Sequence, residues 1–322
     1  MKKRWLFTIL LLLTLTGCRN EHTQYSTTTV ETIKESSYQF TDALGREVGV
    51  TESKRVAALL GSFADIWYLA GGEVIASADD AWEDFDLPLP EDAVNLGMTK
   101  ELSLEKLFAA DPDLVLASSN TKGNVEWLET LEAAGITVAY FEVNDFEDYL
   151  NVLKICTDIT GRADLYEKNG LAIQQQIEHV IQQSKKRIEE RGEAPKVLSL
   201  RASSTYIRAK NSKNNVLGEM LAALGCVNIA DSEESLLENL SMEQIILQDP
   251  EYIFFVQQGD DAEGTKANIE KFIMENPAWS NLTAVKEEKV YLLEKPLYAL
   301  KPNDRWGEAY EKLEERLSNE DQ

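Results

Sequence analysis

The sequence predicts a two-lobed α/β protein whose halves are joined by one long helix, and three observations lead to this prediction. Short β-rich runs alternate with helical segments from Phe40 onward, which indicates parallel sheets covered by helices. One long helical stretch, Ala163 to Arg191, interrupts this alternation, which resumes after Pro195. A set of short motifs recurs at one fixed separation on the two sides of that stretch.

The N-terminus has the order of a secretory signal. Basic residues precede an apolar run from Trp5 to Leu15 that is too short to span a bilayer, and small residues follow. Leu-Thr-Gly-Cys at 15–18 resembles the bacterial lipobox, in which the cysteine is acylated and becomes the first mature residue. We therefore expect a signal peptide over 1–17 and acyl chains such as palmitate on Cys18, which would anchor the protein at the extracytoplasmic face of the cell membrane.

The remaining composition limits the possible function classes. Residues 18–37 are polar and cannot bury enough apolar surface to fold alone, so they are interpreted as a tether. The chain has 56 acidic and 32 basic residues and a formal charge of −24, which argues against nucleic-acid binding. Cys156 and Cys226 are expected to be buried as small apolar side chains, and spacing does not decide whether they form a disulfide.

Each lobe is predicted from its strand-like runs. The first lobe is expected over 38–161, the connecting helix over 162–192 and the second lobe over 193–322. The predicted strands of the first lobe are Arg55–Leu60, Val74–Ala78, Asp113–Ala117 and Ile136–Phe141, and those of the second are Lys196–Leu200, Tyr252–Val256 and Lys289–Leu293. Helices are expected near Phe63–Ala70, Leu104–Ala109 and Asn124–Ala134 in the first lobe.

The connecting helix is predicted from its apolar period. Ile173, Ile177, Val180, Ile181 and Ile188 recur at three- to four-residue steps, which gives one apolar stripe. At about 1.5 Å per residue the whole stretch would span roughly 40 Å. This length favours a spine between the lobes over an ordinary surface helix, although a glycine at position 170 is a potential early break.

A duplication is the most informative pattern. Leu-Ser-Leu-Glu at 102–105 and Asp-Pro-Asp at 111–113 are matched by Leu-Ser-Met-Glu at 240–243 and Asp-Pro-Glu at 249–251, all 138 residues later. A looser match links 69–72 with 223–226, and its larger separation predicts extra residues in the second lobe around 203–215. Equal separations indicate that the two lobes are related units.

The duplicated glutamates, Glu105 and Glu243, have two interpretations. Ser103 and Ser241 suit helix N-caps, with Gln244 completing a capping box, so each glutamate falls in a first turn where the helix dipole favours it. A matched pair, one per lobe, also suits a two-fold symmetric partner that carries arginines. Spacing alone does not separate these interpretations.

Together the motifs resemble those of the bacterial ABC-transporter binding proteins for iron-siderophores, haem and cobalamin. The resemblance rests on the lipobox, Asp-Ala-Leu-Gly-Arg at 42–46, the paired Ser-x-Glu helices that end in Asp-Pro, the long connector and the ending Lys-Pro-Asn-Asp-Arg-Trp at 301–306. It covers the chain from about Phe40 to the C-terminus. It implies two Rossmann-like α/β lobes joined by a single long connecting α-helix, with a ligand cleft between the lobes. It also implies that Glu105 and Glu243 dock onto arginines of a permease dimer, which works with an ATPase.

Open α/β sheets bind ligands beyond the carboxyl ends of their strands, and this rule selects the candidate cleft residues. They are Ser62, Phe63, Asp80, Trp82, Ser119, Asn120, Arg201, Tyr206, Arg208, Gln258, Tyr298 and Arg305. Aromatic walls with a few arginines suit a large anionic metal chelate. Any one of these residues could instead have a purely structural role. Trp82 could pack on the surface of a lobe, and Arg305 could cap the last helix.

We therefore expect a monomeric receptor without enzymatic activity or a resident cofactor, which binds a metal chelate carrying Fe3+ or a corrinoid. A ferric siderophore ranks first because that class is the broadest, and haem and cobamides remain open. A free-metal receptor is disfavoured because only His22 and His179 are available. A carboxylate-dependent hydrolase using the acidic run at 79–86, and a surface adhesin or signalling lipoprotein, are the alternatives from other classes.

Overall fold

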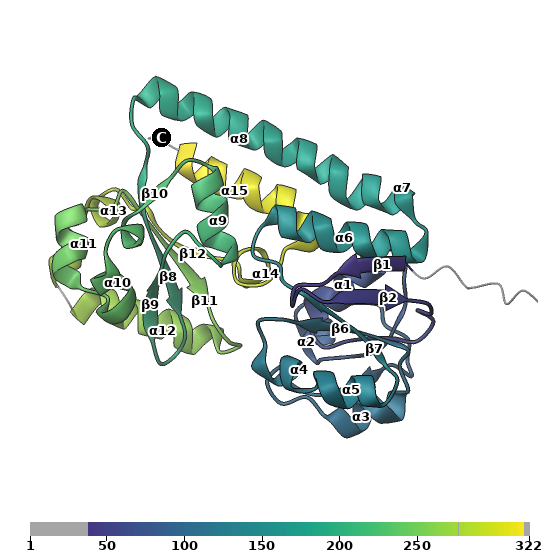
Figure 1. Cartoon of the computed structure of the whole chain (residues 1–322). Coiled ribbons are helices and arrows are strands. Elements are labelled where there is room, and N and C mark those ends of the chain that lie inside the picture. The colour runs from purple at the N-terminus through teal and green to yellow at the C-terminus, as the bar shows by residue number, and fades with distance from the viewer. Residues whose placement is uncertain (1–37, 276, 319–322) are drawn as a thin grey trace, which may run out of the picture. The chain divides into compact units, whose positions relative to one another are not determined.

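The structure is a computed structural model that describes residues 38–275 and 277–318. The predicted signal peptide, Cys18 and the tether lie outside the described residues. Two sheets of mainly parallel strands, with one long helix that runs alongside both lobes, confirm the predicted α/β architecture (Figure 1).

The first sheet has the order β5-β4-β3-β6-β7, and every neighbouring pair is parallel. Its strands are β3 (Val56–Ala58), β4 (Val74–Ser77), β5 (Val94–Asn95), β6 (Leu114–Ser118) and β7 (Thr137–Phe141). Side chains of β6 alternate between two core clusters, because neighbouring residues of a strand face opposite sides. Apolar side chains therefore cover both faces, as expected for a parallel sheet.

Helices follow the strands of this sheet in turn. They are α1 (Gly61–Leu69), α2 (Asp80–Glu83), α3 (Leu104–Ala110), α4 (Lys122–Glu126), α5 (Leu128–Ala133) and α6 (Phe146–Thr160). The single helix predicted near 124–134 is divided into α4 and α5, with Trp127 between them. A hairpin of β1 (Tyr38–Thr41) and β2 (Glu47–Val50) precedes the sheet, and its turn is held by Asp42, which accepts hydrogen bonds from the backbone of Leu44 and Arg46.

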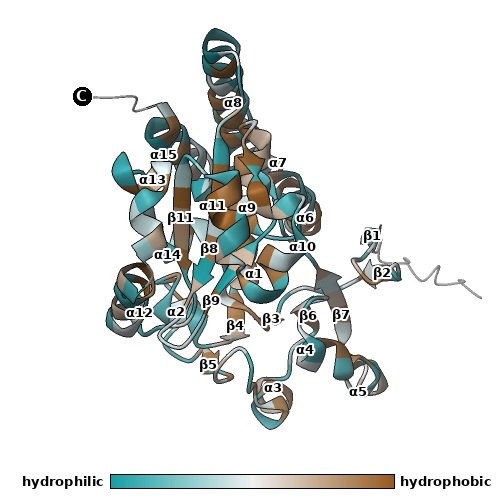
Figure 2. Cartoon of the chain, turned by 90° about the vertical axis from the view of Figure 1, so that its left-hand side faces the viewer, coloured by the Kyte–Doolittle hydropathy of each residue, from teal (hydrophilic) through white to brown (hydrophobic). Residues whose placement is uncertain are grey.

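The second sheet has the order β10-β8-β11-β12, with β9 antiparallel to β8. Its strands are β8 (Lys196–Ala202), β9 (Ile207–Lys210), β10 (Val227–Asn228), β11 (Tyr252–Gln257) and β12 (Val290–Leu293). The accompanying helices are α9 (Val216–Ala223), α10 (Glu234–Asn239), α11 (Met242–Gln248), α12 (Ala262–Glu275), α13 (Thr283–Lys286), α14 (Lys295–Tyr298) and α15 (Trp306–Ser318), with short 3-10 turns η2 (Ile229–Asp231), η3 (Pro277–Asn281) and η4 (Asn303–Arg305). Figure 2 shows the apolar character of the buried strands β4 and β11.

The connecting helix consists of α7 (Ala163–Tyr166), the π-helical turn η1 (Glu167–Leu171) and α8 (Ala172–Arg191), without a break between them. Gly170 lies in the π turn, where an added Cβ would be only 3.0 Å from the Leu150 side chain of α6, so a larger residue would require that side chain to shift. Ile173, Ile177 and Val180 are buried, as the predicted stripe requires.

Polar contacts fix the connecting helix to both halves. Near its start, the Asn169 side chain donates to Leu69 O (2.8 Å), and the Tyr149 hydroxyl donates to Asn169 O (2.8 Å). Further along, the buried Ser184 hydroxyl donates to Leu224 O (2.7 Å). The helix is therefore held to α1 and α6 at one end and to the end of α9 further along.

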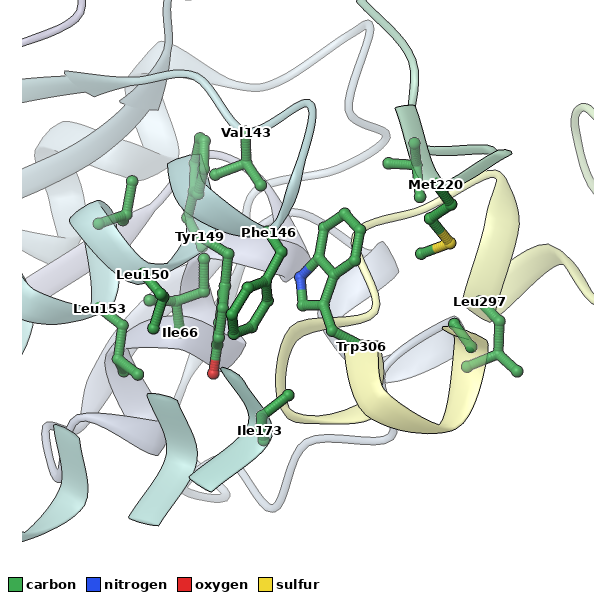
Figure 3. Packing of buried hydrophobic residues seen from close by; sticks show 14 of the residues in the cluster. Ile66, Val143, Phe146, Tyr149, Leu150, Leu153, Ile173, Met220, Leu297 and Trp306 are labelled. Atoms are coloured by element: carbon green, nitrogen blue, oxygen red, sulfur yellow. The ribbon is translucent and has the colours of Figure 1, made fainter. Parts of the chain in front are cut away.

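The C-terminal segment returns from the second sheet to the first. The Asn303 side chain donates to Ser62 O (3.0 Å) and to Asp65 Oδ2 (2.7 Å) in α1. Trp306 is fully buried and meets the ring of Phe146 edge to face at 6.1 Å, and Figure 3 shows it between Phe146 and Met220. One core cluster therefore contains residues from both halves.

The duplication predicted from sequence has a structural counterpart in the helix ends. Ser103 and Ser241 accept hydrogen bonds from the third residue beyond them, at 3.2 and 3.5 Å, and so cap α3 and α11. Both helices end at a left-handed aspartate, Asp111 (φ 53°) and Asp249 (φ 43°). The reciprocal half of the predicted capping box is absent, because the buried Gln244 Oε1 has no hydrogen-bond partner among the described residues.

The looser repeat, 69–72 with 223–226, also corresponds to equivalent helix ends in the two lobes. Gly71 (φ 84°) and Gly225 (φ 76°) end α1 and α9 in the left-handed region, and the residue after each donates to the carbonyl five positions back, Trp67 O and Leu221 O. The extra residues predicted around 203–215 contain β9, which no strand of the first sheet matches.

Candidate functional site

A cavity of about 520 Å³ lies between the two lobes, beyond the carboxyl ends of β4 and β11. The first lobe contributes the α2 segment and the loop at 98–101, and the second lobe contributes 258–260, Lys295 and Leu300. Its position agrees with the rule for open α/β sheets, and its volume suits a small-molecule ligand. Of the predicted cleft residues, Asp80 and Gln258 line this cavity.

Lys295 crosses this cavity from the second lobe. Its ammonium contacts Asp84 of the first lobe at 2.7 Å and Asp260 of the second at 2.6 Å. Burial lowers the pKa of Lys295, but the hydrogen bonds to Asp260 and Asp84 outweigh burial and leave the pKa above its usual value. The lysine therefore stays charged and links the two lobes beside the cavity.

Asp80 holds the loop that follows β3. Its Oδ1 accepts a hydrogen bond from Gly61 N at 2.7 Å. An added Cβ at Gly61 would lie 2.5 Å from Ala81 N, so only glycine permits this approach of α1 to α2. Burial raises the pKa of Asp80 to about 6, although the hydrogen bond from Gly61 opposes this increase.

The second lobe repeats this contact in a more exposed setting. Asp231 Oδ1 accepts from Ser212 N at 2.7 Å, and both acceptors lie nineteen residues after their donors. Asp231 is exposed, whereas Asp80 is half-buried at the cavity wall. Asp80 was selected from sequence by its loop position, but its matched partner in the second lobe was missed because the two segments share no residue pattern.

A basic cluster, defined as Arg201, Arg208 and Lys210, occupies one face of the β8–β9 hairpin. Arg201 pairs directly with Arg208 across the strands, and Lys210 lies two residues further along β9, so the three share one face. Burial lowers the pKa of Arg201, and burial with the charges of both arginines lowers that of Lys210. Within the described part of the chain no carboxylate forms a salt bridge with these cations.

Local hydrogen bonds position this hairpin. Ser203 Oγ accepts from the backbone of Thr205 and Tyr206, both at 3.2 Å, which closes the turn between the strands. The Asn268 side chain of α12 donates to Ser203 O at 2.8 Å and supports the turn from below the sheet. Arg208 lies over the Tyr206 ring at 5.1 Å, so the predicted Arg201, Tyr206 and Arg208 are brought together.

Lys210 and Lys301 were missed by the sequence analysis. Lys210 was detectable, because it alternates with Arg208 along one strand. The Lys301 ammonium lies 5.4 Å from the Phe63 ring centroid, and burial lowers the pKa of Lys301 while Asp80 and Glu142 oppose that decrease. Its position depends on the return of the C-terminal segment to the first lobe, which no local pattern reveals.

Several predicted cleft residues have structural roles instead. Ser62, Phe63 and Tyr298 are buried, and the Tyr298 hydroxyl donates to Ala309 O at 3.0 Å, so the prediction that they form an open cleft surface is corrected. Arg305 forms an ion pair with Glu308 in the last helix (2.8 Å). Half-buried Trp82 packs against the large core cluster, in line with its structural alternative.

Ser119 and Asn120 follow β6 and lie near the carboxylate of Glu142. Ser119 donates to Phe141 O through its backbone N–H (3.1 Å), and Asn120 is exposed. Hydrogen bonds from the side chains of Asn120 and Asn144 lower the pKa of Glu142 below its usual range. These residues place an ionised carboxylate next to Lys301, with no contact to the basic cluster.

Glu105 and Glu243 are exposed, each in the first turn of its helix. Neither makes a salt bridge with any residue that the structure describes. Their carboxylates are therefore available both to the helix dipole and to an external cation.

The remaining thiols and metal-ligating side chains of residues 38–275 and 277–318 do not form a further site. In these residues no group of three or more His, Cys, Asp or Glu side chains is arranged to hold a metal ion. Cys156 and Cys226 are free, buried thiols, as the burial prediction stated, and burial raises the pKa of each to about 12. No helix in this part of the chain has the length and apolar character needed to cross a membrane.

Several known proteins are similar to this chain in sequence or in architecture. The chain is 27% identical over 303 residues to the iron-uptake system-binding protein of Bacillus subtilis, which covers 91% of each chain. It is 26% identical over 253 residues to the Fe(3+)-citrate-binding protein YfmC of the same species, covering 74% of this chain and 72% of that protein. Staphylococcus aureus SirA, solved with staphyloferrin B, matches with a TM-score of 0.68 at 20% identity, over 88% of this chain and all of SirA.

The match to a protein family covers both lobes and the helix between them. The family model for periplasmic binding proteins matches residues 56–297, which include both sheets described above. This chain therefore belongs to the periplasmic binding protein family.

Proposed function

We propose that the protein is a lipid-anchored extracytoplasmic receptor that captures an anionic ferric chelate and delivers it to an ABC importer. The single observation that carries the proposal is the basic cluster of Arg201, Arg208 and Lys210. In a chain with a formal charge of −24, three neighbouring cations on one face lack carboxylate partners in the described structure. Arg201 and Lys210 are partly buried, and partly buried cations without partners are costly, so an anionic ligand would offset that cost.

The chemistry of the cluster favours carboxylate-rich chelates. The forked guanidinium groups of Arg201 and Arg208 match the two oxygens of a carboxylate, and Lys210 adds a point charge. Tyr206, already stacked with Arg208, supplies an aromatic surface beside them. A ferric complex of a citrate-type siderophore offers several carboxylate oxygens at its periphery and would satisfy this arrangement.

The relatives support the same class. One is named for iron uptake and one for binding Fe(3+)-citrate, and SirA was solved with staphyloferrin B. The iron is cargo in this proposal and arrives already chelated. Delivery to a dimeric permease would use Glu105 and Glu243, and Cys18 would hold the receptor at the membrane, as the resemblance implies.

Haem is the second candidate, favoured by one observation. Met98 is 57% exposed and lines the interlobe cavity, and a thioether is an established axial ligand of haem iron. A haem complex would show a Soret band whose position changes in Met98→Ala. The carboxylate-chelate proposal ranks above it because Met98 is one uncharged contact, whereas the cluster has three cations.

Tryptophan fluorescence of the purified full-length chain tests the proposal. Trp82 is half-buried in α2, next to the cavity residues Asp80 and Glu83, whereas half-buried Trp127 lies between α4 and α5, away from the cavity lining, and Trp67, Trp279 and Trp306 are fully buried. Titration with ferric citrate, ferric staphyloferrin B, haemin and cyanocobalamin should give saturable quenching by a ferric carboxylate chelate, at micromolar affinity or tighter. Trp82→Phe should remove most of that signal without changing affinity. Saturation by haemin or cobalamin alone would replace the proposed ligand, and no response from a folded sample would argue against a chelate receptor.

A further inference from the structure

Each docking glutamate is followed by an exposed apolar side chain on the same helix. Phe108 is 38% exposed in α3 and Ile246 is 45% exposed in α11. Phe108 lies three residues after Glu105, and Ile246 lies three residues after Glu243. Residues three apart are neighbours on a helix surface, so each helix presents a carboxylate and a large apolar group side by side.

The two helices present these pairs in the same way. Both begin at a serine cap and end at a left-handed aspartate, and the residue before each exposed apolar side chain, Leu107 or Ile245, is fully buried. The buried residue sets the rotation of its helix, so the carboxylate and the apolar side chain have matching orientations in the two lobes. Phe108 and Ile246 are also 138 residues apart, the separation of the original repeat.

Isolated exposed apolar residues are common on protein surfaces and need no functional explanation. The structure has others, including Met274 of α12, which is 80% exposed, whereas the residue 138 positions earlier, Ile136, is only partly exposed. What distinguishes Phe108 and Ile246 is that both occupy equivalent positions beside equivalent carboxylates. Leu247, 73% exposed, enlarges the apolar surface in the second lobe, where the matching residue of α3 is Ala109.

We propose that Phe108 and Ile246 are apolar anchors of the docking surface. They would enter two equivalent apolar pockets on the outer face of a two-fold symmetric permease dimer, each pocket beside an arginine that receives Glu105 or Glu243. This inference rests on the proposed importer function and adds residues to its interface. The occupant follows from charge and symmetry: two exposed carboxylates, each with an apolar neighbour, complement two cations that each lie beside an apolar recess.

The two kinds of contact have different consequences for binding. Rim charges mainly steer association and set orientation, whereas desolvated apolar anchors mainly slow dissociation. The glutamates alone would give a salt-sensitive and short-lived encounter. The neighbouring apolar groups would prolong docking long enough for ligand transfer.

Photo-crosslinking in the bacterium that encodes the chain tests the interface directly. p-Benzoylphenylalanine is placed at position 108 or 246, at position 105 or 243 as the docking reference, and at position 274 as the exposed control. The expected result is a crosslink to one permease, identified by mass spectrometry, from 108 and 246 but not from 274. Crosslinks from 105 and 243 without any from 108 and 246 would overturn the inference and leave the docking function standing.

Uptake of 55Fe from ferric citrate gives the second measurement, in cells whose own copy of the gene is replaced by each variant. Phe108→Ser with Ile246→Ser should lower uptake at least about tenfold, with ferric citrate affinity within about twofold of wild type. Phe108→Leu with Ile246→Leu should restore uptake, and Met274→Ser should leave it unchanged. Full uptake by the double serine variant would overturn the inference. Full uptake by Glu105→Arg with Glu243→Arg would instead remove the docking function on which it rests.

Discussion

The two lobes share a framework but differ at the ends of their strands. In both, a central strand is followed by a helix that ends at a left-handed glycine, and a capped helix leads to the next strand. In the first lobe β3 passes to α1 across only two residues, whereas in the second lobe β9 is inserted between β8 and α9. The duplicated positions support the fold, and they also carry the proposed docking surface, whereas the unmatched insertion carries the proposed ligand-binding cluster.

The same comparison applies to charge. The first-lobe wall of the cavity carries Asp79, Asp80, Glu83 and Asp84, and the inserted hairpin of the second lobe carries the basic cluster. In the proposed complex an anionic chelate would contact the cations of the second lobe and face the carboxylates of the first, where Lys295 offsets Asp84 while also pairing with Asp260 of its own lobe.

The largest predicted effect concerns the duplicated glutamates. Glu105→Arg combined with Glu243→Arg should reduce uptake of 55Fe from ferric citrate to the level of cells without the gene, because both contacts with the permease arginines become repulsive. Chelate affinity should change less than about twofold, since neither residue belongs to the cavity lining or to the basic cluster. The single variants sharpen the comparison: equal partial losses would mean that the two lobes dock equivalently, and a loss from one variant only would assign docking to one lobe.

The next effect separates the basic cluster from the acidic wall of the cavity. Arg201→Ala should weaken ferric chelate binding about 10- to 100-fold, because a hydrogen bond to a charged group contributes roughly 1.5–3 kcal/mol. Arg201→Lys should lie between this variant and wild type, since it keeps the charge but loses the forked geometry. Affinities would come from the tryptophan titration.

The variant matched to Arg201→Ala is Glu83→Gln, on the acidic first-lobe wall of the cavity. Removing that carboxylate should leave affinity for an anionic chelate unchanged or improved. Lys186→Ala, on the exposed face of α8, is the control for losing a cation elsewhere. Weaker binding in Glu83→Gln together with unchanged binding in Arg201→Ala would mean that the acidic cavity wall, and not the basic cluster, contacts the ligand.

Asp80 gives a pH-dependent prediction. Its pKa is about 6 in the folded protein against 3.8 in the unfolded chain, so between these values the folded state holds the proton more tightly. The stabilisation is present below about pH 4 and is lost as the pH rises through about 6, by up to about 3 kcal/mol. Asp80→Asn keeps an acceptor for Gly61 and should remove this component, so the difference in unfolding free energy between wild type and variant should change across that window.

Urea unfolding at several pH values measures this difference. Asp231→Asn is the matched comparison, since Asp231 makes the equivalent contact with Ser212 but is exposed. Parallel curves for wild type and Asp80→Asn from pH 4 to 7 would mean that Asp80 has the same proton affinity in the folded and unfolded chain.

The framework was predictable from sequence because its signals are local. β-rich runs located the long strands, the apolar period located α8, and equal separations located the repeat. The very short strands β5 and β10 were not predicted, since two residues carry no period. The helix near 124–134 was predicted as one element, and the structure divides it at Trp127.

The site was less predictable because it depends on contacts between distant segments. Loop position selected Asp80 and Gln258, which line the cavity, and Arg201, Tyr206 and Arg208, which the structure brings together on one hairpin. It failed for Phe63 and Tyr298, because position after a strand does not reveal which aromatic side chains turn into the core. Lys295 and Lys301 were missed because the long-range return of the C-terminal segment places them opposite the first lobe.

The smallest predicted effect tests how far the equivalence of the lobes extends. Ser103 caps α3 through a 3.2 Å hydrogen bond to Lys106 N, whereas Ser241 caps α11 through a 3.5 Å bond to Gln244 N. Ser103→Ala should lower the local stability of α3 by about 1 kcal/mol, and Ser241→Ala should lower that of α11 by only a few tenths, because the longer bond contributes less. Hydrogen exchange at Lys106 N–H and Gln244 N–H measures each helix separately, and Ser→Thr at each position keeps the hydroxyl as a control. Equal losses would show that the caps are energetically equivalent, and the asymmetry between the lobes would then be confined to the ligand-facing loops.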